Sequence, residues 1–361
     1  MSNARKSGLT KRGEIWHLDK QFRGFRIRES TGSKSVTEAV ALLAHRIEGV
    51  RLAQLYGVRP KRTFLQAAQK YLAENQQKRT IGDDEYHLSI LGPFIDDEYL
   101  SRIYMQTLQP FIQSRRKDGV KTQTINLSIE KVRRILRLAA HEWRDEQGLT
   151  WLEAAPKIKL FRVTDARRPY PLSVDEERLL FRQLPEHLLR MALFKVNTGC
   201  RQEEVCSLKW EWEKSVPELH TSVFVIPGTQ VKNFEDRLIV LNRYAMSAIE
   251  SARGMHPVFV FVQKKGGSTA PIKKMNITGW RRARERAGDL LAMTEGTITP
   301  VGFRCVRVHD LKHTFGRRLR AAGVSFEDRQ DLLGHKSRRI TTYYSKSELV
   351  NLISAAEKAC N

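Results

Sequence analysis

Cysteine and long apolar runs are both scarce in this sequence. Its 361 residues include four cysteines, with no CxxC pair and no other short metal-binding spacing, so neither a disulfide framework nor a zinc framework is expected. No segment approaches the roughly 18 to 20 consecutive apolar residues of a membrane span, and the opening MSNARKSGLTKRG lacks the apolar stretch of a signal peptide. These absences predict a cytoplasmic protein with reduced thiols and no membrane partner.

Acidic residues are also few relative to basic ones. The chain has 63 Lys and Arg against 40 Asp and Glu, a net charge of +23. A polyanionic partner accounts for this excess, because each phosphate that a protein neutralises releases condensed counterions. The basic residues are spread along the chain, with clusters as late as WRRARER (residues 280–286). We therefore expect several modules that bind nucleic acid together, in association with the nucleoid.

Composition and periodicity divide the chain into several parts. Residues 1–58 contain two short strand patterns and a helical pattern, which indicate a small β-plus-helix module. Residues 63–146 indicate an all-helical domain. The proline-containing segment 147–171 is interpreted as a linker, and residues 172–361 indicate an α-rich α+β domain that ends in a tail helix at about 346–359.

Two helix starts carry a capping-box pattern, with Thr63 and Gln66 at the first and Ser173 and Glu176 at the second. In the last domain, helices are expected over about 173–197 and 201–210, again from about 276 and 309, with a strand hairpin between SVFVIPG and RLIVLN.

Four short stretches of the last domain carry the candidate chemistry. They are NTGCRQEEVCSLKW with Arg201 and Glu204, GTQVKNFEDRLIVL with Lys232, VHDLKHTFGRRL with His309, Lys312 and His313, and LLGHKSRRITTYYS with His335, Tyr343 and Tyr344. Together they resemble the tyrosine recombinase (phage integrase) family, which has an Arg in TGxRxxE, a hairpin Lys, an H-x-x-R-H box, and a nucleophilic Tyr nine residues after the His of L-G-H.

The resemblance covers residues 170–350 by motif and the whole chain by layout. It implies an arm-binding N-terminal module, an all-helical core-binding domain of the SAM-like kind, and a recombinase catalytic domain. Tyr344 lies nine residues after His335, so the family spacing favours Tyr344 as the nucleophile and leaves Tyr343 as a packing neighbour.

Cleavage of a phosphodiester by a hydroxyl group creates negative charge on the non-bridging oxygens, which fixed positive donors stabilise. Arg201 offers a planar fork for two phosphate oxygens, and Glu204 is placed to orient neighbouring polar groups. The resemblance implies that Lys232 protonates the leaving 5′ oxygen. His309 and His335 would donate hydrogen bonds to the phosphate or move protons near Tyr344. A phosphotyrosine conserves the bond energy, so no cofactor and no metal are expected.

Each of these residues also has a plain structural interpretation. Arg201 and Glu204 fit a helix-surface ion pair, Lys232 a solvated turn lysine, and His309 a capping or core residue. The histidines of HDLKH have the spacing of a zinc helix, but no third ligand is evident. In the recombinase interpretation His313 is a supporting residue.

Lys312 departs from the family pattern, because it occupies the position of the family's second arginine. Lysine keeps the charge but loses the bidentate fork. Our hypothesis is that cleavage is impaired while DNA binding is kept.

The sequence therefore predicts a site-specific DNA integrase of a prophage or other mobile element, which acts on core and arm attachment sites as a homotetramer through a Holliday junction. A directionality factor and a DNA-bending host protein are further possible partners. Alternatives are an architectural DNA-binding protein stalled by Lys312, a type IB topoisomerase and a metal-dependent transposase. The tail stripe of Leu349, Leu352, Ile353 and Ala356 either packs on its own domain or docks on a neighbouring protomer.

Overall fold

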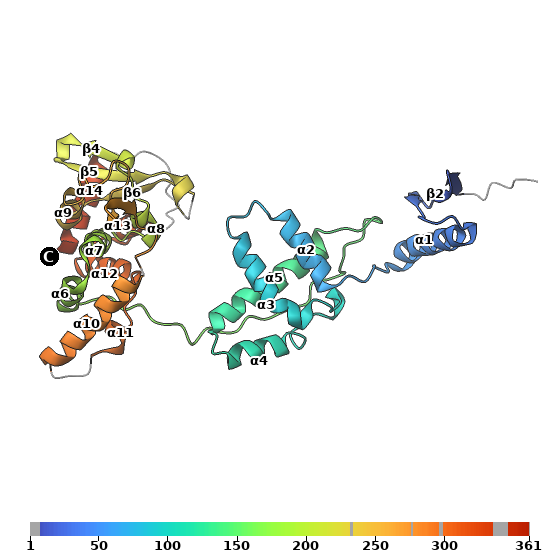
Figure 1. Ribbon diagram of the computed structural model, residues 1–361, viewed down its shortest axis with the longest axis horizontal. Helices are drawn as coiled ribbons and strands as arrows, with labels where there is room; N and C mark the ends of the chain where they lie inside the picture. Colours follow the sequence, from blue (N-terminus) through green and yellow to red (C-terminus); the bar gives the residue numbers. More distant parts are fainter. Residues whose placement is uncertain (1–7, 232–233, 276, 296–298, 335–345, 361) are drawn as a thin grey trace, which may run out of the picture. The chain divides into compact units, whose positions relative to one another are not determined.

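The computed structural model describes residues 8–231, 234–275, 277–295, 299–334 and 346–360. The chain divides into two compact units, Met1–Arg167 and Arg168–Asn361, and each is described by itself (Figure 1). Within the described ranges, no helix has both the length and the apolar character needed to cross a bilayer.

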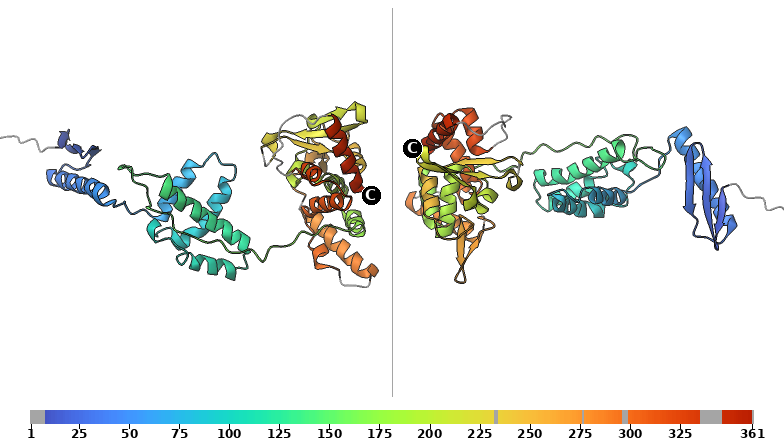
Figure 2. Two further views of the ribbon diagram at one scale, coloured as in Figure 1. Left: turned by 180° about the vertical axis from the view of Figure 1, so that it is seen from behind. Right: turned by 90° about the horizontal axis from the view of Figure 1, so that it is seen from above.

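The first unit begins with a three-stranded antiparallel sheet in the order β1 (Leu9–Arg12), β2 (Ile15–Phe22), β3 (Phe25–Ser30). Helix α1 (Val36–Tyr56) runs alongside this sheet (Figure 2). Leu18 on the sheet and Ala39 on the helix are both fully buried. The small β-plus-helix arrangement is the one that the sequence predicts.

Helices form the rest of the first unit: α2 (Phe64–Glu74), α3 (Ile81–Ile95), the short 3₁₀ turn η1 (Leu100–Arg102), α4 (Gln109–Lys117) and α5 (Thr122–His141). The predicted capping box at the start of α2 is confirmed, because the Thr63 side chain accepts from the backbone of Gln66 and the Gln66 side chain accepts from the backbone of Thr63. These helices enclose one apolar core around Phe64, Phe111 and Ile129.

The segment 147–171, interpreted from its prolines as a linker, packs along part of its length. Leu152 and Ile158 are buried in the helical core. The Asn126 side chain donates to the Phe161 carbonyl at 2.8 Å and accepts from the Phe161 N–H at 2.9 Å. The first half of this segment is therefore part of the helical fold.

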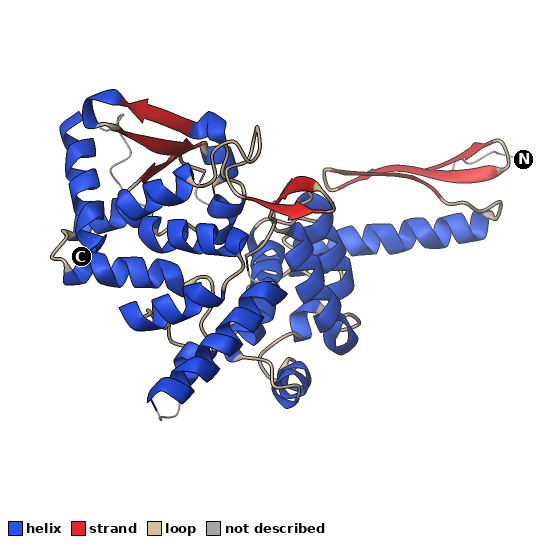
Figure 3. Ribbon diagram, turned by 60° about the vertical axis from the view of Figure 1, so that its left-hand side comes forward, coloured by secondary structure: helices blue, strands red, loops and turns tan. Residues whose placement is uncertain are grey.

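Helices dominate the second unit (Figure 3). In chain order its elements are α6 (Val174–Gln183), α7 (Glu186–Thr198), α8 (Gln202–Cys206), η2 (Trp210–Trp212), β4 (Glu213–Val216), η3 (Pro217–Leu219), β5 (Thr221–Ile226), η4 (Gly228–Gln230), β6 (Arg237–Val240), α9 (Arg243–Glu250), β7 (Val262–Lys265), β8 (Ser268–Pro271), α10 (Thr278–Glu295), α11 (Val301–Arg304), α12 (Asp310–Ala321), α13 (Phe326–Leu333), α14 (Lys346–Glu357) and η5 (Lys358–Cys360). Strands β4, β5 and β6 form an antiparallel sheet in that order, and β7 pairs with β8.

The predicted capping box at Ser173 and Glu176 is confirmed. The single helix expected over 173–197 is instead two helices, because Pro185 forces an extended conformation on Leu184 before it. The helix expected over 201–210 ends at Cys206, since residues 208–210 hydrogen-bond to residues 258–260.

The tail helix α14 packs on the second unit itself. Leu352 and Ala356 are buried in a cluster that includes Phe315 and Leu319 of α12, and Leu349 and Ile353 pack against it partly buried. In this chain alone, the apolar stripe of the tail is therefore covered by its own domain.

Candidate active site

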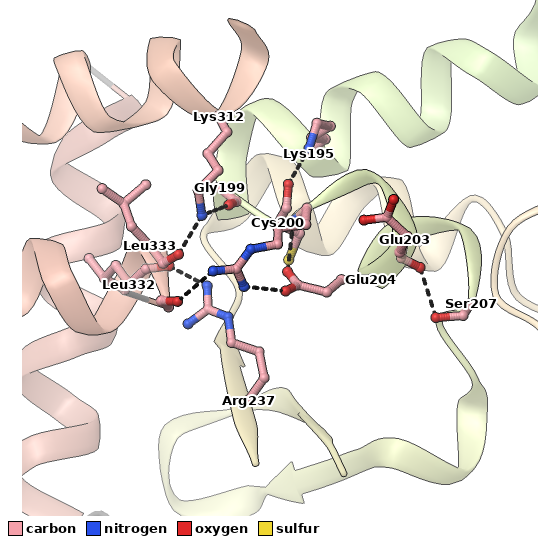
Figure 4. Close-up of polar contacts among 12 residues, drawn as sticks. Lys195, Gly199, Cys200, Glu203, Glu204, Ser207, Arg237, Lys312, Leu332 and Leu333 are labelled. Atoms are coloured by element: carbon pink, nitrogen blue, oxygen red, sulfur yellow. Dashed lines mark hydrogen bonds and ion pairs between the residues drawn. The ribbon is translucent and has the colours of Figure 1, made fainter. Parts of the chain in front are cut away.

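The structure describes five of the candidate site residues, namely Arg201, Glu204, His309, Lys312 and His313. Lys232, His335, Tyr343 and Tyr344 lie outside the described residues. The polar contacts of this region gather between the start of α8, the first turn of α12 and the carboxyl end of α13 (Figure 4).

A tight turn between α7 and α8 places Arg201. Gly199 closes α7 in the left-handed conformation with a φ of +64°. A Cβ atom at this glycine would lie 2.8 Å from a ring carbon of Phe315 and 2.9 Å from a methyl carbon of Leu333. Both the backbone conformation and the close packing therefore require glycine in the TG pair of the motif.

Arg201, whose side chain is 20% exposed, forms an ion pair with the buried Glu204. The Arg201 backbone N–H donates to one Glu204 oxygen at 2.7 Å, and Arg201 Nη1 donates to the other at 2.7 Å. Glu204 is 3% exposed. Burial alone would raise the pKa of Glu204, but the positive charge of Arg237 and the hydrogen bonds from Arg201 hold it below its ordinary value. A helix-surface ion pair, the plain alternative, does not describe this arrangement.

Lys312 points inward. It is 5% exposed, and its ammonium donates to the Gly199 carbonyl at 2.7 Å and also to the Leu333 carbonyl. Burial, followed by the positive charge of Arg237, lowers its pKa to about 7. The sequence suggests a cation offered to phosphate, whereas the structure shows a lysine that joins the α7–α8 turn to the end of α13.

The buried ammonium of Lys312 makes stability depend on pH. Its pKa is about 7 in the folded chain against 10.5 for an ordinary lysine, so between these values the unfolded chain binds more protons. The free energy of unfolding should therefore rise with pH above 7, by at most about 1.4 kcal/mol per pH unit. Lys312→Met should lack this gain. Denaturant unfolding of both chains from pH 6 to 9 would measure the difference. If the free energy of unfolding changes with pH in the same way in both chains, the lowered pKa of Lys312 is contradicted.

His309 precedes α12 and His313 lies one turn further, with the ring centroids 5.0 Å apart and the rings edge to face. Partial burial of the His309 ring, together with the charges of Lys195, His313 and Lys312, lowers its pKa. A neutral imidazole at physiological pH can accept a proton. Within the described ranges, no three His, Cys, Asp or Glu side chains gather as a metal site would require.

Sequence reasoning missed two buried cations beneath this site. Arg237 on β6 is 6% exposed, and its Nη1 and Nη2 atoms donate to the carbonyls of Asp331 at 2.6 Å and Leu332 at 2.5 Å. Lys195 on α7 is fully buried, and its ammonium donates to the Cys200 carbonyl. The available signal was a single cation at the start of one apolar run, RLIVL for Arg237, and inside another, LFKV for Lys195.

Three cations from three elements thus bind the carbonyl groups of residues 331–334 in order: Arg237 binds the first two, Lys312 the third, and Arg201 Nη2 the fourth at 3.1 Å. These carbonyls lie at the carboxyl end of a helix, where the helix dipole favours positive charge. The next residue in the sequence is His335.

Comparison with known proteins places this arrangement in a family. Residues 173–349 match the phage integrase family. The chain is 26% identical to the integrase of Salmonella phage P22 over 93% of this chain and 90% of that protein, and 25% identical to the tyrosine recombinase XerA of Thermococcus kodakarensis over 69% and 79%. The fold is similar to that of a lambda integrase tetramer bound to a Holliday junction, with a TM-score of 0.57 and 15% identity over 94% of this chain and 98% of the other. The chain belongs to the tyrosine recombinase (phage integrase) family.

Proposed function

We propose that this chain is a site-specific DNA recombinase, the integrase of a prophage or another mobile element, that cuts and rejoins DNA through a 3′-phosphotyrosine. The observation that carries the proposal is the gathering of Arg201, Glu204 and Lys312 around the end of α13. His335 follows this helix end directly and Tyr344 lies nine residues later. The similarity to a phage integrase over most of both chains supports the same function.

In the proposed reaction the Tyr344 oxygen bonds to phosphorus and the bond from phosphorus to the 5′ oxygen breaks. Lys232 gives the departing oxygen its proton. The tyrosine proton passes to a neighbouring base, for which His309 and His335 are the candidates. Attack by the 5′ hydroxyl of another strand reverses these steps, so neither ATP nor a cofactor is consumed.

Arg201 would stabilise the charge on the non-bridging oxygens. Its Nη1 and backbone N–H are held by Glu204, and its Nη2 by the Gly334 carbonyl. A guanidinium group fixed on two sides cannot rotate freely, so little orientation entropy is lost when phosphate arrives. His313, whose ring lies against His309, would support that ring in its working orientation.

The first unit would supply the DNA contacts outside the active site. On strand β3 the exposed side chains include Arg26 and Arg28, on the sheet face that also carries Arg12 of β1. A strand pair fits the major groove, which makes this face our candidate for arm-site binding. The helical domain and the catalytic domain would together enclose one half of the core site.

Four protomers would act on two DNA segments and exchange strands through a Holliday junction, as in the similar lambda integrase assembly. A directionality factor and a DNA-bending host protein remain proposed partners.

An architectural, non-cleaving DNA-binding protein is the second candidate. The observation in its favour is that the Lys312 ammonium faces two backbone carbonyls, so the second positive donor to the phosphate is weakened. The two functions differ in whether the protein becomes covalently attached to DNA.

A nicked suicide substrate with the core site of the encoding element distinguishes the two functions. Incubation in chelator followed by a denaturing gel should reveal a protein–DNA adduct. If the DNA is bound but neither this chain nor its Lys312→Arg variant forms an adduct, the architectural function is favoured.

Lys312→Arg is expected to accelerate cleavage. With two donors on the Gly199 and Leu333 carbonyls, an ammonium group has one N–H left, whereas a guanidinium group has three and can offer two of them to phosphate. One additional charge-assisted hydrogen bond of about 1.4 kcal/mol corresponds to roughly a tenfold faster rate. Single-turnover adduct formation by the two chains measures the effect, and equal rates would refute the hypothesis that lysine slows this enzyme.

A further inference from the structure

Arg237 lies within the GTQVKNFEDRLIVL stretch but is not one of the residues that the family pattern specifies there, yet it contacts the same helix end as the motif residues. It is the first residue of β6, and its two terminal nitrogens bind the Asp331 and Leu332 carbonyls. Figure 4 shows Arg237 and Lys312 approaching the end of α13 from opposite sides. Since only 6% of Arg237 is exposed, its guanidinium group is not available as a docking site for DNA.

The packing around this guanidinium group is specific. Gly334 ends α13 with a φ of +59°, and a Cβ atom there would lie 2.5 Å from Arg237 Nε. Nε is itself buried and has no hydrogen-bond partner among the described residues. A buried charge with one unsatisfied donor is costly, so the two carbonyl contacts of this group are needed to keep it buried between β6 and α13.

Arg237 also stands at the base of the segment that contains Lys232. Its register partner across the hairpin is Ile226, the last residue of β5. The adjacent Asp236 accepts a hydrogen bond from the Gly228 N–H at 2.8 Å, which closes the segment at its base. Lys232 lies between these closing residues in the sequence. Arg237 therefore connects the base of this segment to α13, the helix whose C-cap Gly334 directly precedes His335.

We infer that Arg237 is a positioning residue for strand cleavage: it fastens the base of the Lys232 hairpin to the carboxyl end of α13, so that the leaving-group acid is held in place relative to Arg201. This inference rests on the proposed recombinase function. Arg237 acts through Lys232 and touches no reacting atom.

Arg237→Met is expected to slow single-turnover adduct formation by about 100-fold, the effect of a displacement of roughly 1 Å in a reacting group. Binding to the core site without cleavage should change less than about threefold, because phosphate contacts dominate affinity. Arg237→Lys should recover part of the rate, since one ammonium can bind one of the two carbonyls.

A matched control is Arg253→Met in the same unit. Arg253 has ion pairs to Glu213 and Glu250 and a side chain that is 44% exposed. Within the part of the chain that the structure describes, its hydrogen bonds go to these two carboxylates and not to α13. Its loss should leave the cleavage rate unchanged.

The decisive measurement uses two suicide substrates that differ only at the bridging atom of the cleaved bond, 5′ oxygen or 5′ sulfur. A thiolate leaves without a proton because thiols are far more acidic than alcohols, so the sulfur substrate does not need Lys232. The factor by which Arg237→Met slows cleavage should therefore be at least about tenfold smaller with the 5′-sulfur substrate than with the 5′-oxygen substrate. For each variant the measured quantity is the ratio of its cleavage rates on the two substrates. A partly unfolded fraction lowers both rates equally and so does not change this ratio.

Equal defects on both substrates would overturn the inference, as would Arg237→Lys behaving like Arg237→Met. If Arg237→Met does not fold, the ratio of the cleavage rates of Arg237→Lys on the two substrates tests the inference in its place. If neither the unaltered chain nor Lys312→Arg forms an adduct with either substrate, the proposed recombinase function is contradicted instead, so the two failures are distinguishable.

Discussion

Replacing Tyr344 with phenylalanine should abolish the covalent protein–DNA adduct, whereas Tyr343→Phe should keep it. The phenol oxygen is the atom that bonds to phosphorus, and phenylalanine has nothing to replace it. Both variants lose one hydroxyl from adjacent positions of the same segment, so each serves as the control for the other. The measurement is the adduct on a nicked suicide substrate, run on a denaturing gel.

Non-covalent binding to the core site should survive in both variants, because neither change alters the net charge of +23. The reverse pattern, an adduct lost only with Tyr343→Phe, would identify Tyr343 as the nucleophile. Loss with both variants would show that the two hydroxyls act together, and loss with neither would exclude this segment as the source of the nucleophile.

Motif spacing predicted that three of the described site residues would meet, but not where the Lys312 ammonium would point. The TGxRxxE and HxxKH patterns predicted that Arg201, Glu204 and Lys312 share a site, and the structure brings them together at the end of α13. The inward direction of Lys312 could not be predicted, because it depends on the carbonyl groups of the α7–α8 turn and of α13, which only tertiary packing brings within reach.

Helix starts followed from local chemistry, and helix ends did not. The capping boxes at Thr63 and Ser173 involve residues three apart, so the sequence alone contains the whole interaction. The end of α8 at Cys206 depends on pairing with residues 258–260, far along the chain. Arg237 escaped notice for the same reason, since its partners lie 94 and 95 residues away.

Arg201→Met is expected to lower the cleavage rate by about 100- to 1,000-fold, the usual effect of removing a donor that stabilises transition-state charge. It should also destabilise the fold. Glu204 is 3% exposed and accepts from Arg201 Nη1, so the variant leaves a buried carboxylate without its closest cation. Breaking such a pair costs about 3–5 kcal/mol. Thermal unfolding and single-turnover cleavage would measure the two losses separately.

The double variant Arg201→Met with Glu204→Gln separates catalysis from stability. In the unaltered chain the backbone N–H of Arg201 donates one of the two hydrogen bonds to Glu204. A neutral amide at position 204 can still accept this bond, and no unpaired carboxylate is left buried. Stability should therefore recover most of the loss while cleavage stays slow. If cleavage recovers together with stability, Arg201 serves the fold alone and the phosphate must be bound by other cations. Persistent instability of the double variant would instead place the main contribution of Arg201 in its contact with the Gly334 carbonyl.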